Sequence, residues 1–206
     1  MNSPHASENH AQLPRKTGRP RTFDEDQAVE TAMHLFWRHG YEGVGMGELT
    51  KAIGVAPPSL YGVFGSKASL YRRALDRYSQ QFPLVEGNVV READSLAQAV
   101  RMLLATAIEV VTSSAGERSC MVSSGMLCAH PDHDDLAKEL GQRRDGFRLE
   151  IATLLAPWIE PPRLYSVARH LAAVLQGFSI QARDGATREE LLETADEIAR
   201  GFSDSR

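Results

Sequence analysis

The 206-residue sequence is poor in cysteine, contains no long apolar run and has no N-terminal secretion pattern. Its two cysteines, Cys120 and Cys128, are too few for a disulfide framework and do not match a zinc-binding spacing. No apolar run reaches the roughly eighteen residues that a membrane-spanning helix needs. The first residues lack the basic-then-apolar layout of a signal peptide. These absences predict a cytoplasmic protein with no membrane partner.

Motifs typical of enzymes are also missing. We find no nucleophile elbow, no phosphate-cradling glycine loop and no His-Glu-x-x-His zinc motif. Residues 130–135 contain two histidines and three aspartates, but a proline and acidic residues are equally what a helix start needs. We therefore predict no enzyme activity, no cofactor and no metal site. A small all-helical enzyme remains the alternative from a different class.

The net charge of −4 argues against a protein coated with basic residues. Its distribution is uneven, because lysine and arginine slightly outnumber acidic residues in the first eighty positions and acidic residues dominate afterwards. The 42% of hydrophobic residues suffice for a core. This asymmetry favours nucleic-acid contact through the N-terminal third alone.

Residues 45–67 have the pattern of two short helices joined by a tight turn. Leu49, Ala52 and Ile53 give the first helix an apolar face, and Gly54 suits its left-handed end. The second helix can begin at a proline, and its predicted buried face is Leu60, Val63 and Phe64. Its outer face would be small, flat or hydroxylated: Ala56, Pro57, Pro58, Ser59, Tyr61 and Gly62. Such a helix-turn-helix suits insertion into the DNA major groove, although the same fold can serve only protein interaction.

Helices are predicted on both sides of this motif. Asp24 is a suitable N-cap for a helix that Gly40 would end, and Ser66 or Lys67 would begin another that runs to about residue 82. Lys67 opposes the dipole at its helix start, which is easier to explain if it contacts a DNA phosphate. Residues 1–22 are polar and predict a disordered arm, in which Arg19 and Arg21 would enter a narrow minor groove. A merely solvated basic tail is the alternative.

Three linked stretches resemble the TetR family of bacterial transcriptional regulators: Gly-Arg-Pro-Arg at 18–21, Leu-Phe-Trp-Arg-His-Gly-Tyr-Glu-Gly at 35–43 and Ser-Leu-Tyr-Gly-Val-Phe-Gly-Ser-Lys at 59–67. The resemblance covers about residues 18–80 and implies an all-α protein. By that pattern, residues 23–82 form a three-helix DNA-binding domain, and residues 83–206 form a larger helical ligand-binding and dimerisation domain. It further implies a repressor released from a palindromic operator by a small-molecule inducer.

The same resemblance assigns roles to individual residues. Tyr61 and Lys67 would touch phosphates, and Ala56, Pro57, Pro58 and Ser59 would lie nearest the bases. The family commonly has Thr or Ser before the first helix of the motif, whereas this chain has Gly45, which is a tolerated cap but lacks the hydroxyl. The outer face also lacks Arg, Lys, Asn and Gln, the usual base readers. Recognition of a particular DNA sequence would then depend on thymine methyl contacts, the arm and DNA shape.

Beyond residue 82, apolar spacing predicts helices at 95–111, 131–156, 162–183 and 188–202, and residues 119–129 form a short apolar stretch between the first two. We see no strand-like alternation and no internal repeat. The last two helices are the expected homodimer interface, because Ala168, Ala172, Ala173 and Gly177 allow close helix approach. The alternative is that these faces only close the core of one chain.

The remaining candidates concern a ligand or an oxidant. An inducer pocket would be mostly apolar, and its candidate residues are Met102, Met121, Met126, Phe147, Trp158, His170 and Phe178, which would serve equally well as core. A thiol-based sensor of oxidants or electrophiles is an alternative, with Cys120 ahead of Cys128 because it follows Arg118 and a predicted loop. Free cysteines are otherwise commonly small buried hydrophobes.

Overall fold

The computed structural model describes residues 24–83, 89–113 and 117–203, and these contain helices and no strands. The α-helices are α1 (Glu25–Gly43), α2 (Met46–Ile53), α3 (Pro57–Phe64), α4 (Lys67–Gln81), α5 (Leu96–Thr112), α6 (Met121–Ser124), α7 (Asp134–Leu155), α8 (Arg163–Arg183) and α9 (Arg188–Arg200). Two short 3-10 helices are η1 (Val89–Glu92) and η2 (Pro131–His133). The predicted all-α fold is confirmed.

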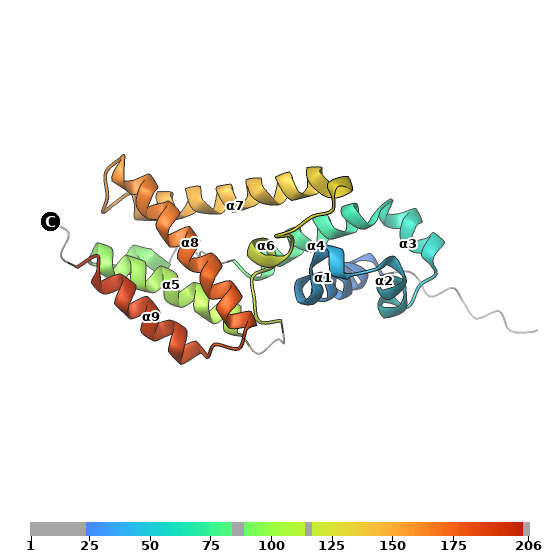
Figure 1. The fold of residues 1–206 in the computed structure, drawn as a ribbon, viewed down its shortest axis with the longest axis horizontal. Helices are drawn as coiled ribbons and strands as arrows, with labels where there is room; N and C mark the ends of the chain where they lie inside the picture. Colours follow the sequence, from blue (N-terminus) through green and yellow to red (C-terminus); the bar gives the residue numbers. More distant parts are fainter. Residues whose placement is uncertain (1–23, 84–88, 114–116, 204–206) are drawn as a thin grey trace, which may run out of the picture.

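The molecule is elongated, with α1–α4 at one end and α5, α8 and α9 at the other (Figure 1). Helix α7 runs along one side between the two ends, and the single turn of α6 lies near the middle. The principal packing partners are α1 with α4, α5 with α9, and α7 with α8. The predicted arm, including Arg19 and Arg21, lies outside the described residues.

Helix ends follow the local signals in the sequence. The side chains of Asp24, Ser66 and Ser95 each accept a hydrogen bond from the backbone N–H three residues later. Thr187 and Glu190 form a complete capping box at the start of α9. Gly40 has φ 71°, a left-handed conformation that interrupts regular α1 and sends Tyr41 inward.

Two predictions about the short helices are wrong. Val63 is 38% exposed rather than buried, and Ala52 is exposed as well. Each of these helices has only eight residues, so a narrow stripe meets the core: Leu49 and Thr50 are buried on α2, and Leu60 and Phe64 on α3. Both exposed residues lie just beyond the edge of that stripe.

Aromatic side chains join α1 to α4. The Phe36 and Tyr71 rings meet edge to face at a centroid distance of 4.9 Å, as do those of Trp37 and Tyr78. All four side chains are buried, and such pairs add to the stability that area burial alone provides. They fix α1 and α4 as the scaffold that carries α2 and α3.

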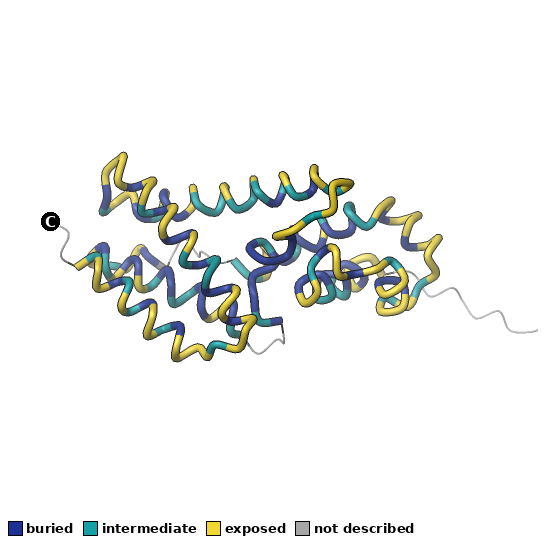
Figure 2. Tube along the Cα trace, in the orientation of Figure 1, coloured by how far each residue is buried: buried dark blue, intermediate teal, exposed yellow. Residues whose placement is uncertain are grey.

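The C-terminal helices differ from expectation in detail. Pro131 begins the 3-10 helix η2 rather than α7. The short apolar stretch at 119–129 contains the single turn α6, which is buried at the centre of the molecule (Figure 2). Of the small residues on α8, Ala168 and Ala172 are already buried within one chain, while Ala173 is exposed. The dimer interface stays a prediction.

Candidate nucleic-acid interface and ligand cavity

The α2–α3 turn is closed by backbone hydrogen bonds. Gly54 has φ 79° and ψ 32°, and its N–H donates to Thr50 O at 3.0 Å. The Val55 N–H donates to the same oxygen at 3.1 Å. At the far end of α3, Gly65 has φ 73° and its N–H donates to Tyr61 O at 2.8 Å. These bonds close the C-terminal ends of α2 and α3 and define the turn between the two helices.

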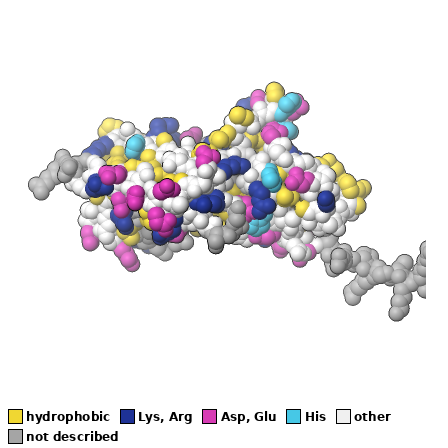
Figure 3. Space-filling model, turned by 60° about the horizontal axis from the view of Figure 1, so that its bottom comes forward, with side chains coloured by type: hydrophobic (Ala, Val, Ile, Leu, Met, Phe, Trp, Pro, Cys, Tyr) yellow, Lys and Arg dark blue, Asp and Glu magenta, His cyan; other side chains and the backbone are white. Residues whose placement is uncertain are grey.

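The outer surface of α3 is free in a single chain. All of the predicted DNA-contact residues on and before it are exposed: Gly45, Ala56, Pro57, Pro58, Ser59 and Tyr61. Val63 joins them, and spacing alone placed it on the wrong side. Hydrophobic side chains gather at the end of the molecule that α3 occupies (Figure 3), whereas charged side chains mix over the opposite end. The arrangement offers shape and apolar contact rather than charged base readers.

Lys67 is more confined than an ordinary surface lysine. It begins α4, and its ammonium lies 4.1 Å from the centroid of the Tyr41 ring. Partial burial lowers the pKa of Lys67, while the carboxylate of Glu42 opposes that shift. The contact orients the charge, and the start of α4 follows closely on the end of α3.

A second set of contacts ties α1 to the chain that follows α5. Glu117 is buried and accepts a hydrogen bond from Arg38 Nη2 at 2.8 Å, and His34 Nδ1 lies 3.1 Å from its other carboxylate oxygen. Trp37 Nε1 donates to Ser119 O at 2.9 Å, and Tyr41 N donates to Gly125 O at 3.0 Å.

Glu42, at the end of α1, contacts both histidines of residues 130–135. Glu42 Oε1 accepts from the backbone N–H of His130 at 3.0 Å and lies 2.7 Å from His133 Nδ1. Burial alone would raise the pKa of Glu42, but these hydrogen bonds and the charge of Lys67 lower it overall. We call the contacts of α1 with residues 117–133 the α1 joint. Sequence reasoning missed it, because its partners are up to 91 residues apart.

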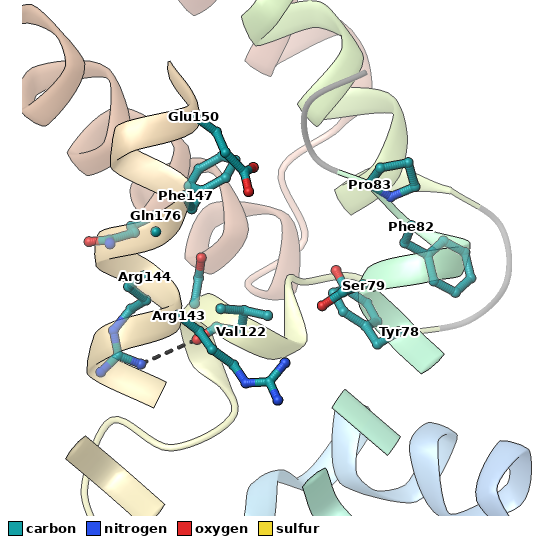
Figure 4. Close-up of a pocket in the computed structure, with 12 residues that line it drawn as sticks. Tyr78, Ser79, Phe82, Pro83, Val122, Arg143, Arg144, Phe147, Glu150 and Gln176 are labelled. Carbon is teal, nitrogen blue, oxygen red and sulfur yellow. Dashed lines mark hydrogen bonds between the residues drawn. The ribbon is translucent and has the colours of Figure 1, made fainter. Parts of the chain in front are cut away.

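A cavity of 420 Å³ lies beside the α1 joint. Its walls come from the end of α4, from α6, α7 and α8, and include Tyr78, Phe82, Val122, Arg144, Phe147 and Gln176 (Figure 4). Arg144 Nη1 donates to Val122 O at 3.2 Å, so the guanidinium ties α7 to α6 at the cavity wall. The size is that of a small-molecule site.

One of the seven predicted pocket residues, Phe147, lines this cavity. The others lie elsewhere: Met121, Met126 and Phe178 are buried in the core, Met102 and Trp158 are half-buried, and His170 is exposed. Nothing in the local sequence marked Arg144 as a wall residue, because the cavity depends on how distant helices pack.

The two cysteines have contrasting positions. Cys120 is 1% exposed and caps α6, accepting a hydrogen bond at Sγ from Ser123 N. Cys128 is exposed, and both thiols are free. Burial makes Cys120 a poor target for a dissolved oxidant, and the thiol-sensor alternative is not favoured.

Comparison with known proteins identifies the group to which these features belong. The family model described as "Bacterial regulatory proteins, tetR family" matches residues 28–74, which run from α1 into α4. The HTH-type transcriptional repressor ComR of Escherichia coli K12 is 34% identical over 185 residues, covering 86% of this chain and 88% of ComR. The repressor BdcR of the same strain is 31% identical over 186 residues, covering 88% and 90%.

Solved structures agree with the sequence relatives. A cysteine mutant of the TetR family regulator CifR, complexed with 26-bp double-strand operator DNA, matches with a TM-score of 0.81 and 32% identity. The match covers 90% of this chain and 100% of that chain. No helix in the described residues is long and apolar enough to cross a membrane. The chain is a member of the TetR family of bacterial transcriptional regulators.

Proposed function

We propose that this chain is a transcriptional repressor that binds operator DNA through α3 and releases it when a small molecule enters the cavity. The observation that carries the proposal is the exposed outer face of α3, which follows a turn closed by backbone hydrogen bonds, in a chain similar over most of its length to two named repressors. The similar CifR structure holds operator DNA, which supports DNA binding by this chain. Residues 23–82 and 83–206 serve as the DNA-binding and ligand-binding domains in this proposal.

Recognition of the operator sequence by α3 would depend on apolar contact with the bases. Ala56, Pro57 and Pro58 can approach thymine methyl groups, and Val63 adds another apolar surface. Arg19 and Arg21 would supply minor-groove contact next to the site. Tyr61 and Lys67 would fix the register of the helix through phosphates, which carry no sequence information.

A homodimer through α8 and α9 would present two copies of α3 to a palindromic operator. Tyr165 and Ile180 are 51% and 37% exposed on α8, and Ala173 is exposed between them. These three positions are spaced by about two turns each, so they share one face of the helix. Exposed Arg169 lies on the same face, so the surface is mixed rather than wholly apolar. Its exposed apolar side chains support pairing of two chains, and half-sites about one helical turn of DNA apart would follow.

The cavity and the α1 joint share the chain around α6. Val122 lines the cavity, while Ser119 and Gly125 on either side hold α1. A ligand that displaces α6 would therefore tilt α1 and change the separation of the two α3 helices. A hundredfold loss of operator affinity needs only about 2.7 kcal/mol of differential binding.

The test is selection of genomic DNA fragments by the purified protein, beginning with DNA that flanks its own gene. We expect salt-dependent binding that prefers particular sequences. Binding to every fragment alike would refute the proposed function. Lys67→Ala should weaken binding to all sequences about equally, and the control Lys138→Ala, an exposed lysine on α7, should not.

The arm has its own test. Removal of residues 1–21 should reduce affinity chiefly for operators with A·T-rich minor grooves. Unchanged affinity would leave Arg19 and Arg21 as parts of a solvated tail.

A further inference from the structure

The cavity contains two neighbouring arginines of α7 in different electrostatic surroundings. Arg143 is neutralised, because its Nη2 lies 2.6 Å from Asp76 Oδ1 and 3.7 Å from Glu139 Oε1. Arg144 donates to the main-chain oxygen of Val122 instead, at 3.2 Å. Across residues 24–83, 89–113 and 117–203, no carboxylate lies within ion-pair distance of Arg144.

This difference leaves a positive charge at the cavity wall. A guanidinium has five N–H donors in a planar fork, and Arg144 uses only one of its nitrogens in the bond to Val122. The side chain is half-buried, so water screens its charge less than at an open surface. A planar carboxylate matches this fork, and bonds between two charged groups are the stronger kind.

The rest of the cavity limits the size and charge of the ligand. Phe82, Pro83 and Phe147 provide apolar walls that suit a hydrocarbon or aromatic body. Glu150 lies toward the other end of the cavity from Arg144 in Figure 4 and is exposed. Its carboxylate would repel a second negative charge, which disfavours dianions such as phosphate monoesters.

We propose that the cavity binds a small organic monocarboxylate, with its carboxylate on Arg144 and its apolar body against Phe82, Pro83 and Phe147. This inference rests on the proposed function, because it gives the chemical class of the inducer. Arg144 also ties α7 to α6 through Val122 O. A carboxylate that draws the guanidinium away from that oxygen loosens α6 next to the α1 joint, which connects recognition of the anion to the position of α1.

The test compares carboxylates with their neutral amides, which have nearly the same shape. The probes are benzoate, phenylacetate and hexanoate, each paired with its amide and added to the full-length protein at millimolar concentration. Calorimetry and thermal unfolding should show at least one acid binding about tenfold or more tightly than its amide. If every acid binds no better than its amide, or if no acid binds, the proposal is overturned.

Variants locate the binding site. Arg144→Gln should abolish the preference for the acid, and Arg144→Lys should retain part of it. The matched control is Arg148→Gln, which lies one turn further along α7, pairs with Asp145 and does not line the cavity. Glu150→Gln should strengthen binding of the acid. A preference that survives Arg144→Gln in a protein with unchanged melting temperature would refute the role of Arg144.

DNA binding without any probe is measured on the same samples. Sequence-preferring DNA binding with no discrimination between acids and amides would refute the monocarboxylate and leave the repressor intact. Tight acid binding by a protein that prefers no DNA sequence would refute the proposed function while supporting the anion site.

Discussion

Gly125 offers the sharpest test of how α6 meets α1 and α4. A Cβ added at this position would lie 2.3 Å from Met121 O and 2.6 Å from the hydroxyl oxygen of Tyr71. Its backbone has φ −67° and ψ −23°, which any residue adopts, so the obstacle is space and not conformation. Ordinary contact would require movement of about 1 Å at a backbone oxygen, and overpacking of this kind costs about 1–3 kcal/mol.

Gly125→Ala should therefore lower the free energy of unfolding by about 1–3 kcal/mol, measured by urea denaturation with the m-value monitored. The control is Gly141→Ala in α7, where the nearest atom to the new Cβ is the end of the Arg144 side chain at 4.0 Å. Glycine inside a helix costs about 0.5–1 kcal/mol relative to alanine, so this control should be neutral or stabilising. Equal stabilities for Gly125→Ala and the wild type would refute the close packing of α6.

Three further changes test polar groups. The hydroxyl of Tyr71 is buried and has no hydrogen-bond partner among the described residues. Tyr71→Phe should therefore leave the free energy of unfolding unchanged or raise it by up to about 1 kcal/mol, measured by urea denaturation. A large loss of stability would show that the hydroxyl does make a hydrogen bond. Because folding lowers the pKa of Glu42, its carboxylate contributes to the free energy of unfolding. That contribution is fully present above the ordinary carboxyl pKa of about 4.3 and is lost as pH falls through the lower folded value. Glu42→Gln should therefore flatten the acid limb of stability against pH, and an unchanged limb would contradict the contacts with His130 and His133. Thr187→Ala should cost about 1 kcal/mol by removing the α9 cap, and intact thermal stability would show that the cap is dispensable.

The parts of the fold that depend on neighbours in sequence were predictable. Ser95 and Thr187 cap helices through bonds that span three residues, and Gly54 ends α2 through its own backbone conformation. The family resemblance rested on similarly local stretches and is confirmed by the relatives. Local chemistry was sufficient in these places.

The parts that depend on distant packing were not predictable. Apolar composition suggested Met121 and Phe178 as pocket residues, but both fill the core, and the cavity forms where α4, α6, α7 and α8 leave space between them. Apolar spacing assigned Val63 to the buried face of α3. In a helix of eight residues, spacing does not show how wide the buried apolar stripe is. The sequence did not mark Glu117 as a structural partner of α1, because only folding brings it to Arg38.

The α1 joint has a consequence for building chimaeric regulators. His34, Trp37, Arg38, Tyr41 and Glu42 follow one face of α1, and each is held by residues that come after α5. A crossover placed between α4 and α5 would graft α1 onto a foreign partner and leave the indole N–H of Trp37 without its acceptor at Ser119. An exchange that keeps α1 together with residues 117–133 should retain both stability and response, so the transferable unit of this protein is discontinuous in sequence.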